Sequence, residues 1–348
     1  MDELALELLK QSNTSPEDLP KSKFRQGLEQ MKKDWMIYVM LIPVVVFFYL
    51  FRYRPIGGIL VAFKRTEDAG ILIGERYFAG FFNFKEIFVG SNYAYRFWRA
   101  FRNTFTLSAY GLFFGFPIPI VIALMFSEIK SEGYRAFTQI ISYLPKFIST
   151  VIITSILIMM FNVKVEGLQA EGFLHQLMQK MGIFSATTKP FVDTSKYFRS
   201  IYIISGIWEG AGYGSIVYFA AIMSISPTNY QAAKIDGANK LDQIRHVTLP
   251  GMAPTLIIML ILRIGEILSV GYEKILLLTN LNQATVQETA EVISTFVISI
   301  TGQFGGGSGS INAVGVAAAA DMFNSVIAML LVLGSNFIAK KVSNTSLF

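Results

Sequence analysis

Six apolar stretches, each long enough to form a membrane-spanning helix, recur along the 348 residues of this chain. About 20 helical residues cross the hydrocarbon of a bilayer, and the shortest stretch, with about 17, lies at the lower limit. The stretches are residues 35–51, 103–126, 137–161, 200–223, 254–278 and 314–337. Helices are required because unpaired backbone groups are costly in lipid. We therefore expect an all-α integral membrane protein with six transmembrane helices.

The composition agrees with lipid as the solvent. The chain is 53% hydrophobic and only 16% charged, whereas soluble domains carry about 25% charged residues. A single soluble α-rich domain with a very apolar core is the alternative. There is no cysteine, and the only two histidines, His175 and His246, lie far apart, so we expect no metal site. The net charge of +6 is scattered between the apolar stretches, which favours contact with anionic membrane lipid over nucleic acid.

Prolines predict where two spans bend. Pro117 and Pro119 lie inside the second span and Pro145 inside the third, and proline interrupts the hydrogen bonding of a helix interior. The two long loops on the other side of the membrane from the chain ends are expected to contain short helices. These helices are predicted near Phe78–Phe88 and around Gly172–Lys180.

The ends of the chain are expected to lie in the cytoplasm. Residues 1–34 mix acidic and basic residues, unlike a cleavable signal peptide, and are predicted to be a cytoplasmic tail. The membrane domain then covers residues 35–341, and residues 342–348 form a second short tail. An even number of spans places both ends on one side, and the short loops give a slight excess of Lys and Arg to that side. The Gly/Ser-rich run Gly302–Ser310 is predicted to be a flexible connector.

One loop, residues 226–250, has the pattern of an amphipathic helix–bend–helix. Ser226 can cap a helix and Pro227 suits its first turn. Asp236-Gly237 then predicts a bend, because glycine accepts backbone conformations that other residues resist. A second helical stretch places apolar residues three apart, namely Leu241, Ile244 and Val247. The element either transmits movement into the spans at its two ends or only rests on the lipid surface.

The spacing within this loop resembles a known motif. Gln231-Ala-Ala-x-x-Asp236-Gly237-Ala238, followed by Ile244, Val247 and Leu249-Pro250, is similar to the cytoplasmic Glu-Ala-Ala loop of binding-protein-dependent ABC importer permeases. Three positions depart from the motif: Gln231 replaces Glu, Ile244 replaces Phe and Val247 replaces Ile. The two apolar replacements preserve an apolar face, whereas Gln231 removes a charge but keeps hydrogen-bonding groups.

The resemblance implies that this loop docks on an ATPase subunit. The residues implied in coupling are Tyr230, Gln231, Ala232, Ala233, Ile235, Asp236, Gly237, Ala238, Leu241, Ile244 and Pro250. Because Gln231 is uncharged, we expect docking to depend more on the apolar side chains and the Gly237 bend than on an ion pair at the first position of the motif.

Further motifs are similar to the carbohydrate-uptake branch of these permeases, in particular to those that import complex oligosaccharides in Gram-positive bacteria. They are Phe101–Thr104, Phe114–Pro117, Ser142–Ser149, Gly206–Trp208 and Gly212–Ile216. The resemblance implies the type I importer fold in a bacterial cell membrane. It also implies a second, homologous permease subunit, two cytoplasmic ATPase subunits and an extracellular lipid-anchored solute-binding protein. ATP and Mg²⁺ would be held by the ATPases, with no cofactor and no catalysis in this chain.

Polar and aromatic residues inside the spans are candidates for a substrate pathway. Ionisable groups in lipid are costly and mark functional sites, and a sugar site needs aromatic faces beside polar groups. The candidates are Trp208, Glu209, Tyr213, Tyr218, Arg263, Glu266, Tyr272, Glu273, Asp321 and Asn324. The alternative is structural: Arg263 and Glu266 would link helices, and the aromatic residues would form an interfacial belt.

Other functions fit the sequence less well. The same architecture importing a peptide, an amino acid or an anion is the first alternative. A membrane-embedded enzyme would need a cluster of carboxylates or histidines at one membrane face, and no such set can be recognised. A purely structural membrane protein would not need the segment Tyr230–Pro250.

Overall fold

The computed structural model describes residues 32–65, 77–161, 172–182, 195–279, 287–302 and 313–342. The chain divides into two compact units, Met1–Ile59 and Leu60–Phe348. The first unit contains helix α3 (Trp35–Phe48), which continues into the π-helical turn η1 (Tyr49–Tyr53). The first predicted span is thus helical, and it extends into the 3₁₀ segment η2 (Arg54–Phe63).

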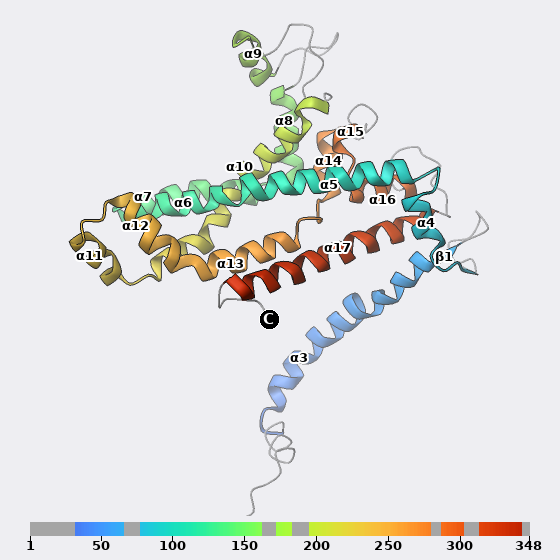
Figure 1. Cartoon of the computed structure of the whole chain (residues 1–348), viewed down its shortest axis with the longest axis horizontal. Helices are drawn as coiled ribbons and strands as arrows, with labels where there is room; N and C mark the ends of the chain where they lie inside the picture. The colour runs from blue at the N-terminus through green and yellow to red at the C-terminus, as the bar shows by residue number, and fades with distance from the viewer. Residues whose placement is uncertain are drawn as a thin grey trace, which may run out of the picture. The chain divides into compact units, whose positions relative to one another are not determined.

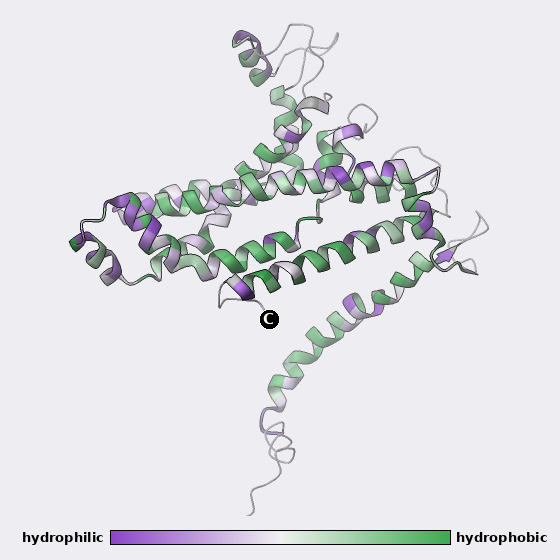
Figure 2. Cartoon of the chain, viewed as in Figure 1, coloured by the Kyte–Doolittle hydropathy of each residue, from purple (hydrophilic) through white to green (hydrophobic). Residues whose placement is uncertain are grey.

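The second unit is built on long helices. Helices α5, α13 and α17 run alongside one another in Figure 1, with α11 and α12 at one end and α4 and α16 at the other. The long helices are α5 (Ala94–Gly115), α6 (Pro117–Glu128), α10 (Ser195–Met223), α13 (Leu249–Gly265) and α17 (Ala313–Val342). Apolar residues cover most of α13 and α17, whereas hydrophilic residues gather in α11 and α12 (Figure 2).

Both predicted proline interruptions are confirmed. The second span divides into α5 and α6 at Pro117, which is the first residue of α6. The third span consists of α7 (Glu132–Tyr143), the 3₁₀ turn η3 (Leu144–Phe147) and α8 (Thr150–Phe161). The two halves of this span are bent by 92° (Figure 1). Pro145 lies in η3, where its missing N–H group ends the hydrogen-bond pattern of α7.

The fifth span differs from the predicted helix over residues 254–278. Helix α13 ends at Gly265, and a separate helix α14 (Tyr272–Leu278) follows after a turn. Side chains from distant segments donate hydrogen bonds to backbone carbonyls of this turn. Asn324 Nδ2 donates to the Leu268 carbonyl at 3.0 Å, and Ser294 Oγ donates to the Val270 carbonyl at 2.8 Å. These contacts come from distant parts of the chain, so the apolar run alone could not show the break.

The start of this span also differs from the prediction. The predicted span begins at residue 254, but the helix starts earlier and runs through Pro250 and Pro254 without a break. It begins with α12 (Lys240–Gln243) and the π-helical turn η5 (Ile244–Thr248), which lead directly into α13. The wider turn of η5 lies immediately before α13, where Pro250 has no N–H group to give to the helix ladder.

Short elements connect the long helices. The two predicted short helices are confirmed as α4 (Phe82–Phe88) and α9 (Phe173–Lys180). Helices α15 (Gln287–Ala290) and α16 (Ile293–Thr301) lie between the fifth and sixth predicted spans and were not anticipated. In the described residues the all-α class holds apart from one antiparallel pair of two-residue strands, β1 (Lys64–Arg65) and β2 (Tyr77–Phe78). Most of Gly302–Ser310 and of the two predicted tails lies outside the described residues.

Within the described residues, four helices are long and apolar enough to cross a membrane, and the bent pair α7–α8 is a fifth candidate. Helix α10 occupies the fourth predicted span. Its 29 residues would extend about 43 Å, but it carries Arg199, Glu209 and several glycines and is less apolar than the others. The number of six spans remains a prediction.

The bend in the third span packs against α10 through backbone contact. A Cβ atom placed on Gly212 would lie 1.9 Å from the Ser142 carbonyl oxygen. Both residues belong to motifs that resemble the carbohydrate-uptake branch. The small residue at position 212 therefore allows α7 and α10 to approach closely, as small residues do in membrane helix packing.

We expect Gly212→Ala to disrupt this packing. The added methyl group would overlap the backbone of α7, and overpacking of this kind costs about 2 kcal/mol or more. Thermal unfolding of the purified complex in detergent should show a lower midpoint for this variant. Gly210→Ala on the same helix is the control, since its Cβ would meet nothing within 4 Å and alanine is the better helix former. Equal midpoints for the two variants would contradict the close contact.

Candidate functional site

The loop between α10 and α13 forms the predicted helix–bend–helix. Helix α11 (Pro227–Ile235) is capped by Ser226, whose Oγ accepts the Thr228 N–H group at 3.3 Å. Gly237 follows with a φ of +80°, a conformation that favours glycine. Asn239 then caps α12, where its side chain and that of Asp242 each accept the other's backbone N–H group, at 3.0 and 3.2 Å.

Polar contacts hold the two halves of the loop together. The Tyr230 hydroxyl lies 3.1 Å from Thr248 Oγ1, which joins α11 to η5. Gln243 Nε2 donates to the Ala238 carbonyl at 3.0 Å, across the bend. Lys240 Nζ lies 2.6 Å from Glu128 Oε2 at the end of α6. The loop is therefore a folded element that is attached to the helix ends.

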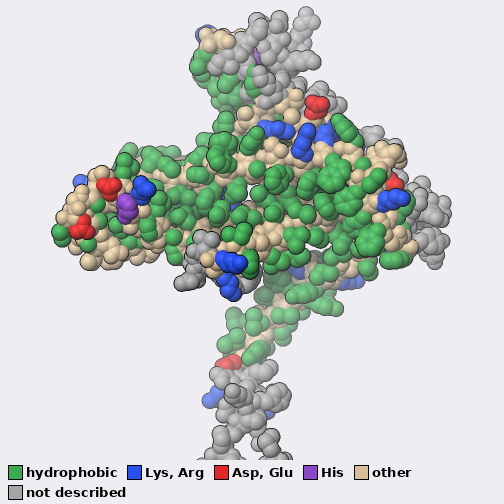
Figure 3. Space-filling model, in the orientation of Figure 1, with side chains coloured by type: hydrophobic (Ala, Val, Ile, Leu, Met, Phe, Trp, Pro, Cys, Tyr) green, Lys and Arg blue, Asp and Glu red, His purple; other side chains and the backbone are tan. Residues whose placement is uncertain are grey.

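The outer side of this loop presents apolar residues to the surroundings. Ile235 is 87% exposed and Leu241 is 76% exposed, which is unusual for large aliphatic side chains outside a membrane-spanning segment. Charged side chains surround them at this end of the molecule (Figure 3). The other exposed members of the predicted coupling set are Gln231, Ala232, Asp236, Gly237 and Pro250.

The remaining coupling candidates point inward. Ala233 and Ala238 are half-buried. Tyr230 and Ile244 are half-buried and line a cavity of about 430 Å³ between the loop and the end of α6, which Gln231 also lines. Ile244 therefore does not share the outer surface with Ile235 and Leu241. The apolar spacing predicted one shared face for all three residues. Spacing alone cannot show how the bend at Gly237 changes the direction of the second helix.

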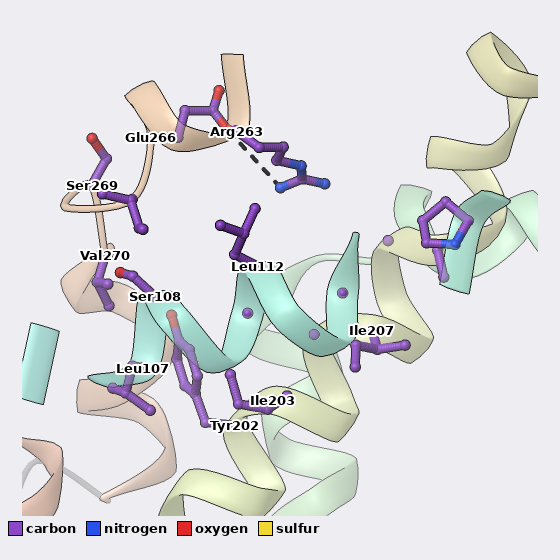
Figure 4. Close-up of a pocket in the computed structure, with 17 residues that line it drawn as sticks. Leu107, Ser108, Leu112, Tyr202, Ile203, Ile207, Arg263, Glu266, Ser269 and Val270 are labelled. Carbon is purple, nitrogen blue, oxygen red and sulfur yellow. Dashed lines mark ion pairs between the residues drawn. The ribbon is translucent and has the colours of Figure 1, made fainter. Parts of the chain in front are cut away.

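A second, larger cavity of about 610 Å³ lies among α5, α10 and the end of α13. Arg263 and Glu266 line it, and their side chains pair at 3.9 Å. Figure 4 shows them on one side and Tyr202 and Ile203 of α10 on the other, with α5 between. Glycines of α5 and α10 contribute to the wall, namely Gly111, Gly115, Gly206 and Gly210. Residues without side chains thus widen the cavity along α5 and α10, and a charged pair lines it at the end of α13.

Glu209 lies at the centre of an ion-pair network beside this cavity. Its Oε2 atom is 3.2 Å from Lys274 Nζ of α14, and its Oε1 atom is 3.6 Å from Lys146 Nζ of η3. The side chains of Glu209 and Lys274 are 16% and 12% exposed, whereas that of Lys146 is 47% exposed. The network joins α10 to the bend of the third span and to the break of the fifth.

The other pathway candidates divide between exposed and structural positions. Trp208 and Tyr213 are 55% and 46% exposed on α10. Tyr218 is buried, and its ring packs edge-on against Phe116 at 6.1 Å, in the core near the loop. Asn324 supports the turn after α13. Tyr272, Glu273 and Asp321 are exposed as well, and, like Trp208 and Tyr213, they do not line the cavity.

Sequence reasoning missed a polar cluster at the end of α5 remote from the loop. The buried Glu291 accepts hydrogen bonds from Arg96 Nε at 3.1 Å and Arg99 Nε at 3.2 Å. Asn103 Nδ2 donates to the carbonyls of Glu288 and Glu291, at 2.8 and 3.0 Å. The spacing of three residues places both arginines on one face of the helix. Their partner Glu291 is nearly 200 positions away, so no local sequence pattern could predict the cluster.

This cluster also explains the Asn103-Thr104 pair quoted from the sequence. Thr104 Oγ1 accepts the Ile293 N–H group at 2.9 Å and donates to the Ala100 carbonyl at 2.8 Å. Arg199 Nη2 donates to Asn103 Oδ1 at 3.0 Å. The pair thereby satisfies the backbone of the segment that enters α16, which is a structural role rather than a substrate contact.

Comparison with known proteins identifies the family. The family model for the inner membrane component of binding-protein-dependent transport systems matches residues 115–338. The chain belongs to this family. The permease is therefore a transport subunit and not an enzyme, and the loop between α10 and α13 falls within the matched segment.

Individual relatives match this permease along nearly their whole length. It is 33% identical to protein LplB of Bacillus subtilis over 320 residues, which are 91% of this chain and 92% of LplB. It is 32% identical to YteP of Bacillus subtilis, a polygalacturonan/rhamnogalacturonan transport system permease protein, over 94% of this chain and 95% of YteP.

A solved structure shows the same fold. The permease resembles a chain of a bacterial ABC transporter involved in the import of the acidic polysaccharide alginate, with a TM-score of 0.76 and 37% identity. The match covers 91% of this chain and 99% of that chain. The same transporter in complex with an alginate pentasaccharide-bound periplasmic protein matches equally well, with a TM-score of 0.76.

We expect Glu209→Gln to destabilise the permease. Without the carboxylate, the buried Lys274 would lose its ion-pair partner, and an unpaired buried charge costs about 3 kcal/mol. The unfolding midpoint of the complex in detergent should fall by roughly 5 °C. Glu273→Gln, an exposed carboxylate on the same helix as Lys274, is the control and should leave the midpoint unchanged. An unchanged midpoint for Glu209→Gln would show that the network does not stabilise the fold.

Ile235→Asp and Leu241→Asp should weaken attachment of the ATPase. Both side chains are exposed, so the variants should fold, but a charge placed in an apolar interface costs several kcal/mol. The measurement is the amount of ATPase that co-purifies with the tagged permease. Met181→Asp is the control, since Met181 is 64% exposed next to α9, far along the chain from the loop. Retention of the ATPase by both loop variants would argue against docking through these residues.

Proposed function

We propose that this permease takes up oligosaccharides as a membrane subunit of an ATP-driven importer. The polysaccharide named for YteP and the alginate named for the solved transporter support a sugar substrate. Both proteins match this chain over more than nine-tenths of its length. The alternative, a non-sugar solute carried by the same architecture, has no comparable support.

One structural observation carries the proposal: a single helical element leads from the loop to the large cavity. The chain is continuously helical from Lys240 in the loop to Gly265, and Arg263 at its far end lines the cavity. Movement of the loop therefore moves the polar end of the cavity. This is the arrangement that an importer needs if ATP-driven closure of its ATPases is to change access to a substrate.

The loop supplies the surface for an ATPase partner. Ile235 and Leu241 are exposed and apolar, Gly237 fixes the bend between them, and Gln231 offers an uncharged amide. We expect two ATPase subunits in the importer, which bind this permease and a second, homologous permease. ATP and Mg²⁺ would bind to the ATPases, and this chain would need no cofactor of its own.

The remaining partners follow from the same assembly. A solute-binding protein would deliver the sugar from outside, as the periplasmic protein in the alginate complex suggests. We place the permease in the cell membrane of a bacterium with both termini in the cytoplasm. A Gram-positive host, with a lipid-anchored binding protein, is consistent with the two Bacillus subtilis relatives.

The proposal is tested by ATPase activity of the reconstituted importer with its binding protein. A panel of plant and microbial oligosaccharides should contain at least one that stimulates hydrolysis, whereas amino acids and peptides should not. Stimulation by a peptide or an amino acid alone would overturn the sugar assignment.

Arg263→Gln should reduce sugar-stimulated activity more than it reduces assembly. Arg263 lines the cavity, and loss of a charged hydrogen-bond donor is worth about tenfold or more in affinity. The measurement is the sugar concentration that gives half-maximal stimulation. Arg245→Gln, an exposed arginine of η5 that does not line the cavity, is the control. An unchanged half-maximal concentration for Arg263→Gln would remove this residue from the pathway.

A further inference from the structure

The network around Glu209 carries an unbalanced charge. Two lysines, Lys146 and Lys274, share this one carboxylate, and in the described part of the chain no other carboxylate lies within ion-pair distance of either. The group as a whole is therefore one unit positive. Neither lysine belongs to the coupling loop or lines the large cavity.

The position of this charge makes it costly. Glu209 is the middle residue of the 29-residue helix α10, so it lies about 21 Å from either end of the helix. If α10 crosses the membrane as the fourth predicted span, that distance places the network near the centre of the bilayer. An ionisable group at this depth is expensive and is found mainly where it faces a partner or a substrate pathway. A structural ion pair would need only one lysine.

The two lysines differ in their surroundings. The Lys274 side chain is only 12% exposed. Its Nζ atom lies 5.7 Å from the centre of the Tyr202 ring and close to Gly206, and both of these residues line the large cavity. Lys146 is about half exposed and lies 3.6 Å from Glu209, which is beyond hydrogen-bond distance. Lys274 thus neutralises Glu209, and Lys146 is left to bind a further anion.

Exposed aromatic side chains lie on the two segments that carry Lys146 and Glu209. Phe147, the next residue, is 74% exposed, and its ring meets that of Tyr213 edge-on at 6.0 Å. Trp208 is also exposed on the same helix as Tyr213. Exposed rings beside a cation supply what a charged sugar needs: a flat apolar surface for the ring carbons and a donor for the carboxylate.

The local backbone favours an anion as well. Lys146 lies in η3 at the 92° bend of the third span, and α8 begins at Thr150, four residues later. Broken helices near the bilayer centre bind substrate in other membrane transporters, with the positive helix N-terminus directed at an anionic group. The bend is held against α10 at Gly212, which keeps Lys146 beside Glu209.

We propose that Lys146, together with the rings of Phe147 and Tyr213, forms a subsite for a carboxylate-bearing sugar unit, so that the permease carries acidic oligosaccharides. This rests on the proposed function and adds the chemical class of the substrate. Lys146 contacts the carboxylate, and Glu209 is a positioning residue that holds the lysine at the bend.

The test uses the complete reconstituted importer with its binding protein and a matched pair of probes. One probe is a uronic acid trisaccharide, and the other is the same trisaccharide with its carboxylates reduced to alcohols. For each we would measure the concentration of loaded binding protein that half-maximally stimulates ATP hydrolysis, and the rate of uptake. Lys146→Met removes the charge and keeps an unbranched side chain, whereas Lys146→Arg keeps the charge.

Lys146→Met should raise the half-maximal concentration for the acidic trisaccharide about tenfold or lower its uptake by a similar factor. It should change the values for the reduced trisaccharide less than about threefold. Lys146→Arg should stay within about threefold of the unsubstituted importer for both probes. Lys180→Met, which removes an exposed lysine from α9, should leave both probes unchanged. Co-purification of the second permease and the ATPases checks that each variant assembles.

Three outcomes would overturn the subsite. In the first, Lys146→Met affects the acidic and the reduced trisaccharide equally. In the second, Lys146→Met releases the second permease, which would mean that Lys146 pairs with a carboxylate of that subunit. In the third, the unsubstituted importer responds only to neutral sugars, which leaves the proposed oligosaccharide function intact. An importer that responded to neither class of sugar would instead overturn the proposed function itself.

Discussion

Two breaks between helices in the described part of this permease are held by side chains from other parts of the chain, which matters because lipid offers no hydrogen bonds to a bare backbone. The turn after α13 is held by Asn324 and Ser294. The entry to α16 is held by Asn103 and Thr104. The first of these breaks also forms part of the cavity among α5, α10 and α13, since Ile267, Ser269 and Val270 of the turn line it.

Close backbone contact is the second requirement of the arrangement. Gly212 lets the bend of the third span approach α10, and that approach brings Lys146 to Glu209. The ion-pair network then connects η3 and α14 to the middle of α10. Packing and electrostatics are therefore coupled here: a change in the small residue would also move the charge.

Much of this structure follows from local sequence patterns. The caps and bend of residues 226–250 were predictable because Ser226, Pro227 and Gly237 act on the backbone within a few positions. The break between α5 and α6 at Pro117 and the bend at Pro145 follow from the missing N–H group of proline in the same way. Long-range contacts were not predictable. The break after Gly265 and the helix α16 depend on partners tens to hundreds of positions away, and the apolar run over residues 254–278 conceals the break.

The candidate site shows the same division. Arg263 and Glu266 could be paired from their spacing, and they do line the cavity. Glu209 was recognised as a costly charge, but its partners Lys146 and Lys274 come from segments whose proximity the sequence does not reveal. Tyr218 and Asn324 have the residue types of a sugar site and serve the fold instead, because residue type does not say which way a side chain faces.

The uninterrupted helix from Lys240 to Gly265 has a mechanical consequence. Its 26 residues extend about 39 Å. The segment can therefore tilt as one rod, with the exposed loop at one end and the cavity at the other. A tilt of about 5° would displace the far end by roughly 3 Å, since displacement grows with the length of the arm. A rotation too small to disturb the packing at the loop would thus be enough to change the width of a passage for a sugar ring.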